Sequence, residues 1–155
     1  MAKRTTKTTH STFVIERTLG APPATVFSAF ADLKAKEQWF SAPSDQCKTE
    51  KREMDFRVGG TETVVGRWNN GMVSDFRARY HDIVPNERIV QSYEMRVNGT
   101  MISVSLATTE LRAEGKGTKL IFTEQDTFLD FDDAGGREHG SIELIDHLVR
   151  VIDGK

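Results

Sequence analysis

The longest helical pattern of hydrophobic residues in the chain lies near the C-terminus, over residues 137–152. At about 100° per residue, its apolar side chains fall on one arc roughly 180° wide. The opposite arc is polar and places Asp146 and Arg150 at a favourable i,i+4 spacing. The apolar positions are Ile142, Leu144, Ile145, Leu148, Val149, Val151 and Ile152. So broad an apolar arc predicts a helix that packs against a sheet.

The chain before this helix has a different pattern, in which short stretches rich in β-branched and aromatic residues alternate with turn residues. Pairs such as Gly59-Gly60 and Asn98-Gly99 can supply the positive φ angles that tight turns need. The predicted strands are residues 12–19, 53–58, 61–68, 73–84, 88–96, 101–113 and 119–126. No helical pattern separates the last six, so neighbouring strands should pair antiparallel as a meander.

The start of the chain adds two short helices and an arm. Residues 1–11 are polar and rich in threonine, which predicts a flexible N-terminal arm before a single domain over residues 12–155. After the first strand, Pro22-Pro23 can open a helix that runs to about Ala31. A second short helix is expected over residues 33–40, followed by a loop that contains Cys47. The elements together predict an α+β fold with a seven-stranded antiparallel sheet.

The apolar residues of the sixth predicted strand do not keep one phase. Ile102, Val104 and Leu106 alternate regularly, whereas Leu111 falls on the opposite face. Both sets can face the helix only if a β-bulge interrupts the strand near residues 108–110. Otherwise Val104 and Leu106 face outward and need another cover, which would indicate a homodimer. We favour this second alternative.

Composition narrows the classes of function. The chain of 155 residues has 21 basic and 23 acidic residues, well mixed, for a net charge of −2. That balance gives no electrostatic reason to expect nucleic acid as a partner. Cys47 is the only cysteine, so a disulfide framework or thiolate metal site is not expected, and a reducing compartment fits best. No apolar run approaches the length of a membrane span, which favours a cytoplasmic protein.

Several phrases of the sequence, in this order, resemble one known superfamily. They are FVIERTLGAPPATVFSAFAD, the tryptophan at Trp39, MDFRVGGTE, ARYHDIVPNERIVQSYEM, GTKLIFTEQDTFLDFDD and REHG, and together they span about residues 13–152. Their order and spacing are similar to the START-like or Bet v1-like (SRPBCC) superfamily. Within it, the chain resembles the branch named after the activator of the ninety-kilodalton heat-shock-protein ATPase. The resemblance implies a helix-grip fold, in which a curved sheet wraps around the last helix and leaves a cavity between them.

Strand phase indicates which polar residues face that cavity. Glu62 alternates in phase with Val64 and Trp68, and Glu124 in phase with Leu120 and Phe122. A carboxylate on such a face is costly unless it is paired, hydrogen-bonded, or in contact with water or ligand. Both structural pairing and ligand contact stay open. The cavity candidates are Trp39, Phe40, Glu62, Trp68, Phe76, Tyr80, Tyr93, Met95, Glu124 and Phe128.

A metal site is not expected on the C-terminal helix. His139, Glu143 and His147 stand at i, i+4 and i+8, a spacing that can align metal ligands on one stripe. The stripe belongs to the polar arc, however, and should point to solvent and away from the cavity. No second predicted element supplies a further ligand. We therefore expect neither a metal nor another cofactor.

These observations favour binding of a small hydrophobic or aromatic molecule in the cavity, without a cofactor. A cofactor-independent enzyme is the alternative, with cyclase-like or dehydratase-like acid–base chemistry by Glu62 or Glu124 together with Tyr80 or Tyr93. A co-chaperone-like interaction module is the second alternative. The resemblance gives it less support, because the co-chaperone of the family carries a further N-terminal domain that this sequence does not show.

Overall fold

Seven strands and three helices make up the described part of the chain, which in the computed structural model is residues 6–130 and 133–154. In chain order the elements are β1 (Thr8–Leu19), α1 (Pro23–Ala31), α2 (Leu33–Glu37), β2 (Cys47–Met54), β3 (Thr61–Trp68), β4 (Val73–Val84), β5 (Arg88–Val97), β6 (Thr100–Glu114), β7 (Gly117–Leu129) and α3 (Ala134–Asp153). The order agrees with the predicted α+β fold. Within the described residues, no helix is long and apolar enough to cross a membrane.

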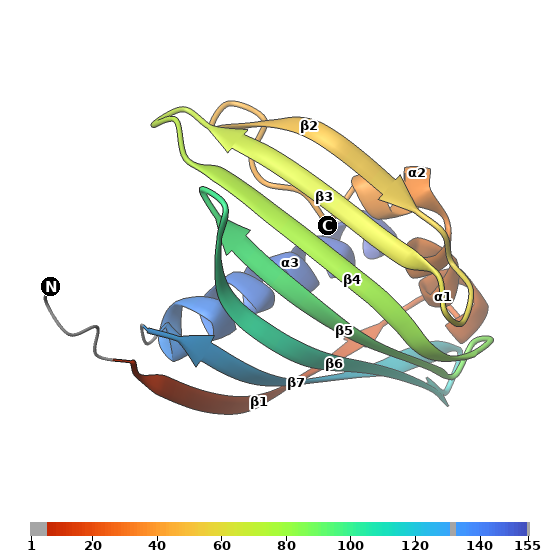
Figure 1. The fold of residues 1–155 in the computed structure, drawn as a ribbon. Helices are drawn as coiled ribbons and strands as arrows, with labels where there is room; N and C mark the ends of the chain where they lie inside the picture. Colours follow the sequence, from red (N-terminus) through yellow and green to blue (C-terminus); the bar gives the residue numbers. More distant parts are fainter. Residues whose placement is uncertain (1–5, 131–132, 155) are drawn as a thin grey trace, which may run out of the picture.

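The strands form a single antiparallel sheet in the order β1-β7-β6-β5-β4-β3-β2. Strands β2 to β7 follow one another as a meander, and β1 pairs with β7 along its whole length. Figure 1 shows the sheet curving across one side of α3, with α1 and α2 at one end. Helix α1 packs on β6 and β7, and α3 packs on β1. This arrangement is the helix-grip fold that the resemblance implied.

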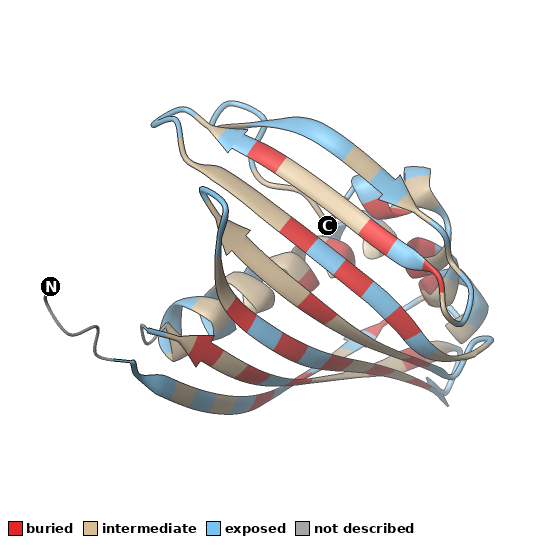
Figure 2. Cartoon of the chain, viewed as in Figure 1, coloured by how far each residue is buried: buried red, intermediate tan, exposed pale blue. Residues whose placement is uncertain are grey.

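Strand alternation places the core on the face of the sheet toward α3. In β4, Phe76, Ala78 and Tyr80 are buried, and the residues between them are exposed. Figure 2 shows the same alternation of buried and exposed positions along β4 and β6. The turn at Asn98-Gly99 has φ angles of 51° and 82°, as predicted for a two-residue hairpin. Period-two patterning and turn chemistry therefore fix the register of most strands.

Helix α3 begins three residues earlier than the pattern indicated and ends at Asp153, where it is capped by Gly154 with a left-handed φ of 71°. Its apolar arc is less deeply buried than its width predicted. Only Ile145 and Leu148 are buried, and Val151 is 43% exposed. The remaining apolar residues of the arc are half-buried. The protein itself covers only part of this arc.

Two boundaries near the start of the chain were predicted wrongly. Strand β1 begins at Thr8 and not at residue 12, because the polar residues at its start pair with the end of β7. The predicted arm thus overlaps β1, and its residues 1–5 lie outside the described residues. Helix α2 ends at Glu37, before the predicted residue 40.

Strand β2 was also misplaced, since it spans Cys47–Met54 where residues 53–58 were predicted. Cys47 therefore lies in a strand and not in a loop. The reason is that β2 is an edge strand with a mostly polar sequence, CKTEKREM, and its pairing with β3 shifts between Thr49 and Lys51. A strand with little apolar alternation gives no period-two signal.

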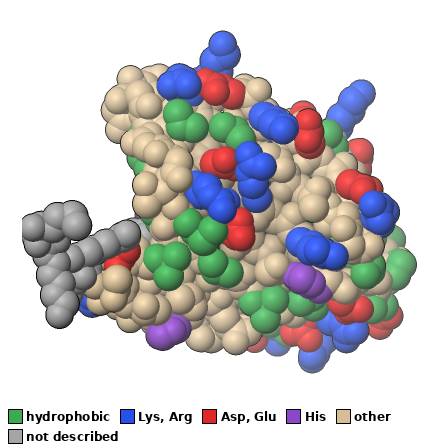
Figure 3. Space-filling view, in the orientation of Figure 1, with side chains coloured by type: hydrophobic (Ala, Val, Ile, Leu, Met, Phe, Trp, Pro, Cys, Tyr) green, Lys and Arg blue, Asp and Glu red, His purple; other side chains and the backbone are tan. Residues whose placement is uncertain are grey.

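In β6, Val104 and Leu106 face outward, which is the second of the two predicted alternatives. Pairing of β6 with β7 runs without interruption from Ser103 to Glu114, so there is no bulge at residues 108–110. Val104 and Leu106 lie on the outer face and are 41% and 38% exposed. Figure 3 shows that face, where acidic and basic side chains are interspersed. The homodimer that outward phase would indicate remains a prediction.

Candidate functional site

A cavity of about 1120 Å³ lies between the inner face of the sheet, α3, and the segment that includes α2. Every strand from β2 to β7 contributes side chains to its wall. Much of the wall is aromatic. The aromatic side chains that line it are Phe30, Trp39, Phe40, Phe56, Trp68, Phe76, Tyr80, Tyr93 and Phe122. Pockets that bind small molecules typically have volumes of about 300–1,000 Å³, and this cavity is slightly larger.

Most of the predicted cavity residues do line this space. They are Trp39, Phe40, Trp68, Phe76, Tyr80, Tyr93, Met95 and Glu124. Glu62 and Phe128 do not, because their side chains are buried within the wall, with 1% and 0% of their surface exposed.

The aromatic side chains form a continuous surface along one side of the cavity. Phe40 makes edge contacts with Trp39 and Phe76, with ring centroids 5.6 and 5.3 Å apart. Phe76 in turn lies 4.9 Å from Tyr93. The indole N–H of Trp39 donates to the backbone carbonyl of Ala29 at 2.9 Å, so its ring offers the cavity mainly apolar surface. Such a surface favours aromatic or aliphatic ligands.

Helix α3 provides the opposite wall. Leu144 and Ile145 line the cavity. Part of the apolar arc therefore faces the cavity and does not pack against the sheet. Glu143 and His147 also border the cavity, so the expectation that the stripe points away from it was wrong for these two residues, whereas His139 does not line the cavity. Glu143 is highly exposed, and its carboxylate lies 3.0 Å from Nε2 of His139. Among the described residues, no three His, Cys, Asp or Glu side chains are grouped so that they could hold a metal ion.

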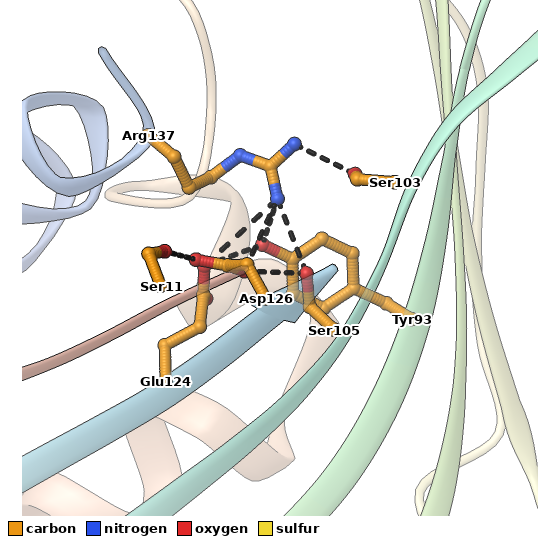
Figure 4. A network of polar contacts seen from close by, with 7 residues as sticks. All are labelled: Ser11, Tyr93, Ser103, Ser105, Glu124, Asp126 and Arg137. Carbon is orange, nitrogen blue, oxygen red and sulfur yellow. Dashed lines mark hydrogen bonds and ion pairs between the residues drawn. The ribbon is translucent and has the colours of Figure 1, made fainter. Parts of the chain in front are cut away.

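One polar cluster, here called the Arg137 group, joins the start of α3 to β5, β6 and β7 (Figure 4). Its members are Ser11, Tyr93, Ser103, Ser105, Glu124, Asp126 and Arg137. The Arg137 guanidinium donates to the hydroxyls of Tyr93 at 3.0 Å and Ser103 at 2.8 Å. It also forms an ion pair with Asp126, 3.5 Å away, whose side chain is fully buried.

The remaining polar atoms of this group are also engaged. The Tyr93 hydroxyl donates to Glu124 at 2.9 Å. Ser11 and Ser105 both donate to the Asp126 carboxylate, at 2.9 and 2.5 Å. With two hydroxyl donors and a guanidinium, the buried charge of Asp126 is well compensated. The polar and charged atoms of the Arg137 group therefore find their hydrogen-bond and ion-pair partners within the protein.

Glu124 holds a proton in this network at neutral pH. Burial raises its pKa to about 9, with a further contribution from the hydrogen bond and charge of Asp126. The hydrogen bond from Tyr93 and the charge of Arg137 oppose the increase. Burial and the neighbouring Glu124 also raise the pKa of Tyr93, so its phenol stays protonated. A neutral carboxyl beside a neutral phenol at a cavity wall can donate and accept hydrogen bonds.

A second polar cluster, here called the Lys36 group, consists of Glu62 with its two hydrogen-bond donors Lys36 and Tyr80, and of Arg52, which contacts Phe40 as Lys36 does. The Lys36 ammonium and the Tyr80 hydroxyl both donate to Oε1 of Glu62, at 2.7 and 2.8 Å. All three side chains are almost completely buried. Burial and the charge of Glu62 raise the pKa of Tyr80, which keeps it a hydrogen-bond donor.

The Lys36 group leaves two buried atoms without a hydrogen-bond partner among the described residues. These are Oε2 of Glu62 and Nη1 of Arg52. Arg52 Nη2 donates to the backbone carbonyl of Phe40 at 2.9 Å, so only one side of the guanidinium is engaged. Unlike the Arg137 group, this cluster is incomplete.

Sequence reasoning missed four of the charged residues in these groups, for different reasons. Asp126 follows Glu124 by two residues in β7, so extending the strand phase by one step would have found it. Arg137 is the first residue of the helical pattern, and the angular position of a residue around a helix does not by itself show whether its side chain faces the cavity or solvent. Lys36 lies in the five-residue helix α2, which is too short for a reliable phase. Arg52 belongs to the misplaced strand β2.

Comparisons with known proteins agree with this architecture. The family model described as Activator of Hsp90 ATPase homolog 1-like protein matches residues 20–153. A solved structure from Rhizobium leguminosarum has 40% sequence identity and a TM-score of 0.92, with 98% of this chain and 100% of that chain covered. The Mll3558 protein from Rhizobium loti also has 40% identity, with a TM-score of 0.86 and coverage of 92% and 97%. Protein CV1439 from Chromobacterium violaceum has 28% identity and a TM-score of 0.74, with coverage of 92% and 96%. No curated protein matches the sequence.

Proposed function

The chain belongs to the family of Activator of Hsp90 ATPase homolog 1-like proteins, and from this premise we propose that it binds a small hydrophobic or aromatic molecule between the sheet and α3. The observation that carries the proposal is the cavity of about 1120 Å³ with its aromatic wall. Ligand sites are commonly concave, largely apolar and supplied with a few polar groups that orient the ligand. The Tyr80, Tyr93 and Glu124 side chains are such groups.

Small residues help to keep the cavity open. Ala107 on β6 is buried, with 2% exposure, and lines the cavity beside Glu124, its partner across the strands. A larger apolar side chain at this position would fill part of the space. Unfilled apolar volume costs stability, so a ligand that fills it should stabilise the fold by mass action.

Cavity filling provides a test with a matched control. Ala107→Phe adds a ring on the cavity side of β6, and Leu106→Phe adds one on the outer face of the same strand. We expect calorimetric titration with naphthylmethanol to show binding by the parent and by Leu106→Phe, and about tenfold weaker binding or none by Ala107→Phe. Native mass spectrometry of the purified parent should show whether a small molecule remains bound. Equal affinity in both variants, or no binding and no retained molecule, would contradict the proposal.

One observation favours acid–base catalysis in the same cavity as a second candidate function. Protonated Glu124 lies 2.9 Å from the Tyr93 hydroxyl, and both side chains line the cavity. A carboxyl with a strongly raised pKa in a cavity can act as a general acid on a carbonyl substrate. If the protein is an enzyme, Glu124→Gln should keep ligand binding and abolish conversion of the bound molecule. Mass spectrometry before and after incubation would measure that conversion.

A further inference from the structure

Arg52 occupies an unusual position on the cavity wall. It lies on β2, is half-buried and faces inward beside Val64, its partner on β3. The bond from Nη2 to the carbonyl of Phe40 fixes the orientation of the guanidinium. Nη1 is buried and has no hydrogen-bond partner among the described residues. The group is thus held in place with part of its donor capacity unused.

An arginine in this state needs a counter-ion. The arginine guanidinium is a cation with five N–H donors and no acceptor, and a buried N–H without an acceptor carries a desolvation cost that no hydrogen bond offsets. No ion pair to Arg52 is found among the described residues. Arg137 on the other wall differs, since Asp126 and several hydroxyls engage it.

Among the three charged residues of the Lys36 group, one positive charge has no ion-pair partner. Lys36 and Glu62 form an ion pair of 2.7 Å and balance each other. Arg52 is then the member without a counter-charge, and it contacts the backbone of Phe40, whose ring packs against Phe76. A positive group beside an apolar cavity complements a molecule that has an anionic end and a hydrophobic body.

We propose that Arg52 binds a carboxylate of the cavity ligand, so that the ligands of this protein are hydrophobic or aromatic carboxylic acids. The inference rests on the proposed binding function and specifies its ligand class. The carboxylate accepts hydrogen bonds from Nη1 of Arg52, and its hydrocarbon part lies along Phe40 and Phe76. Arg52 selects the head group and the aromatic wall supplies affinity.

Matched probes test this assignment at neutral pH. Naphthoate and naphthylmethanol share one ring system and differ in the charge of the head group. Calorimetric titration of the parent should give an affinity for naphthoate about tenfold higher than for naphthylmethanol, as expected for a charge-assisted hydrogen bond. Arg52→Met should remove the preference and leave the affinity for naphthylmethanol nearly unchanged. Arg79→Met, at an exposed position on β4, should keep the preference.

The outcomes separate this inference from the proposed function. Binding of both probes with equal affinity, or a preference that persists in Arg52→Met, would overturn the role of Arg52 and leave the cavity as the binding site. The second result would mean that another group of the cavity wall selects the carboxylate. Arg52→Lys keeps the positive charge and changes the hydrogen-bond geometry. It should retain part of the preference for naphthoate over naphthylmethanol. Failure of both probes to bind would count against the proposed function itself.

Discussion

The Arg137 group and the Lys36 group are both buried, both contain a carboxylate and a cation, and both border the same cavity, yet they differ in completeness. In the first, the Asp126 carboxylate accepts from two serines and pairs with Arg137. In the second, the free oxygen of Glu62 and Nη1 of Arg52 have no partner among the described residues. A satisfied network rigidifies a fold, whereas unsatisfied buried groups carry a cost that a ligand can remove. We therefore infer that the Arg137 group fastens α3 to the sheet and that, in the Lys36 group, Arg52 is available to a ligand in the cavity.

The largest effect is expected when the complete network loses its cation. Arg137→Met would leave the buried Asp126 without its ion-pair partner, which should lower the free energy of unfolding by about 3–5 kcal/mol. Urea unfolding measures the loss. Arg150→Met changes an exposed arginine of the same helix and should cost less than about 1 kcal/mol. Similar losses in both variants would show that Arg137 does not fasten α3.

A smaller effect is expected within the Lys36 group, because Lys36 and Glu62 depend on each other. Lys36→Met leaves Glu62 buried without its cation, and Glu62→Gln leaves Lys36 without its anion, so each should cost about 2–4 kcal/mol. The double variant should lose less unfolding free energy than the two single variants lose together, because neither charge is then left without its partner. A double-mutant cycle by urea unfolding measures this coupling. Additive losses would mean that the pair does not interact.

The protonated state of Glu124 predicts a pH effect. The pKa of its carboxyl is about 9 in the folded protein, above the ordinary value of 4.5. Its contribution to stability is complete below that ordinary value. As pH rises toward 9 the contribution is lost, because only the unfolded chain releases the proton, with a slope of at most about 1.4 kcal/mol per pH unit.

Glu124→Gln should therefore have a flatter dependence of unfolding free energy on pH than the parent between pH 5 and 8. Chemical unfolding of both proteins at several pH values makes the comparison, and the variant should gain relative to the parent as pH rises. A parent and a variant with parallel profiles would show that Glu124 is ionised in the fold.

The smallest effect on stability is expected at Arg52. Arg52→Met removes an unpartnered buried N–H together with one bond to the Phe40 carbonyl, so the change should stay within about 1 kcal/mol. Urea unfolding under the same conditions compares it directly with Arg137→Met. A loss as large as that of Arg137→Met would mean that both arginines serve the fold and that the two groups do not differ.

Much of the fold could be predicted because its signals are local. Period-two alternation in β3, β4 and β7 and turn pairs such as Asn98-Gly99 act over a few residues. The same phase placed Tyr80, Tyr93 and Glu124 on the cavity wall. Strand β2 escaped prediction because an edge strand is stabilised by pairing with its neighbour and not by an apolar face of its own.

The partners of the inward carboxylates could not be predicted, because they depend on tertiary geometry. Lys36 meets Glu62 from a helix 26 residues earlier in the chain, and Arg137 meets Ser103 across 34 residues. No spacing rule connects such pairs. Strand phase identified the buried carboxylates. Only the fold shows which side chains form hydrogen bonds or ion pairs with them.

The location of the bound molecule tests the central claim most directly. Trp39 and Trp68 are the only two tryptophans of the chain, and both line the cavity. In a ¹H–¹⁵N spectrum, titration with naphthoate should shift both indole N–H signals in a saturable way and leave the backbone signals of Val104 and Leu106 on the outer face unchanged. Shifts confined to Val104 and Leu106, with both indole signals unmoved, would contradict binding in the cavity.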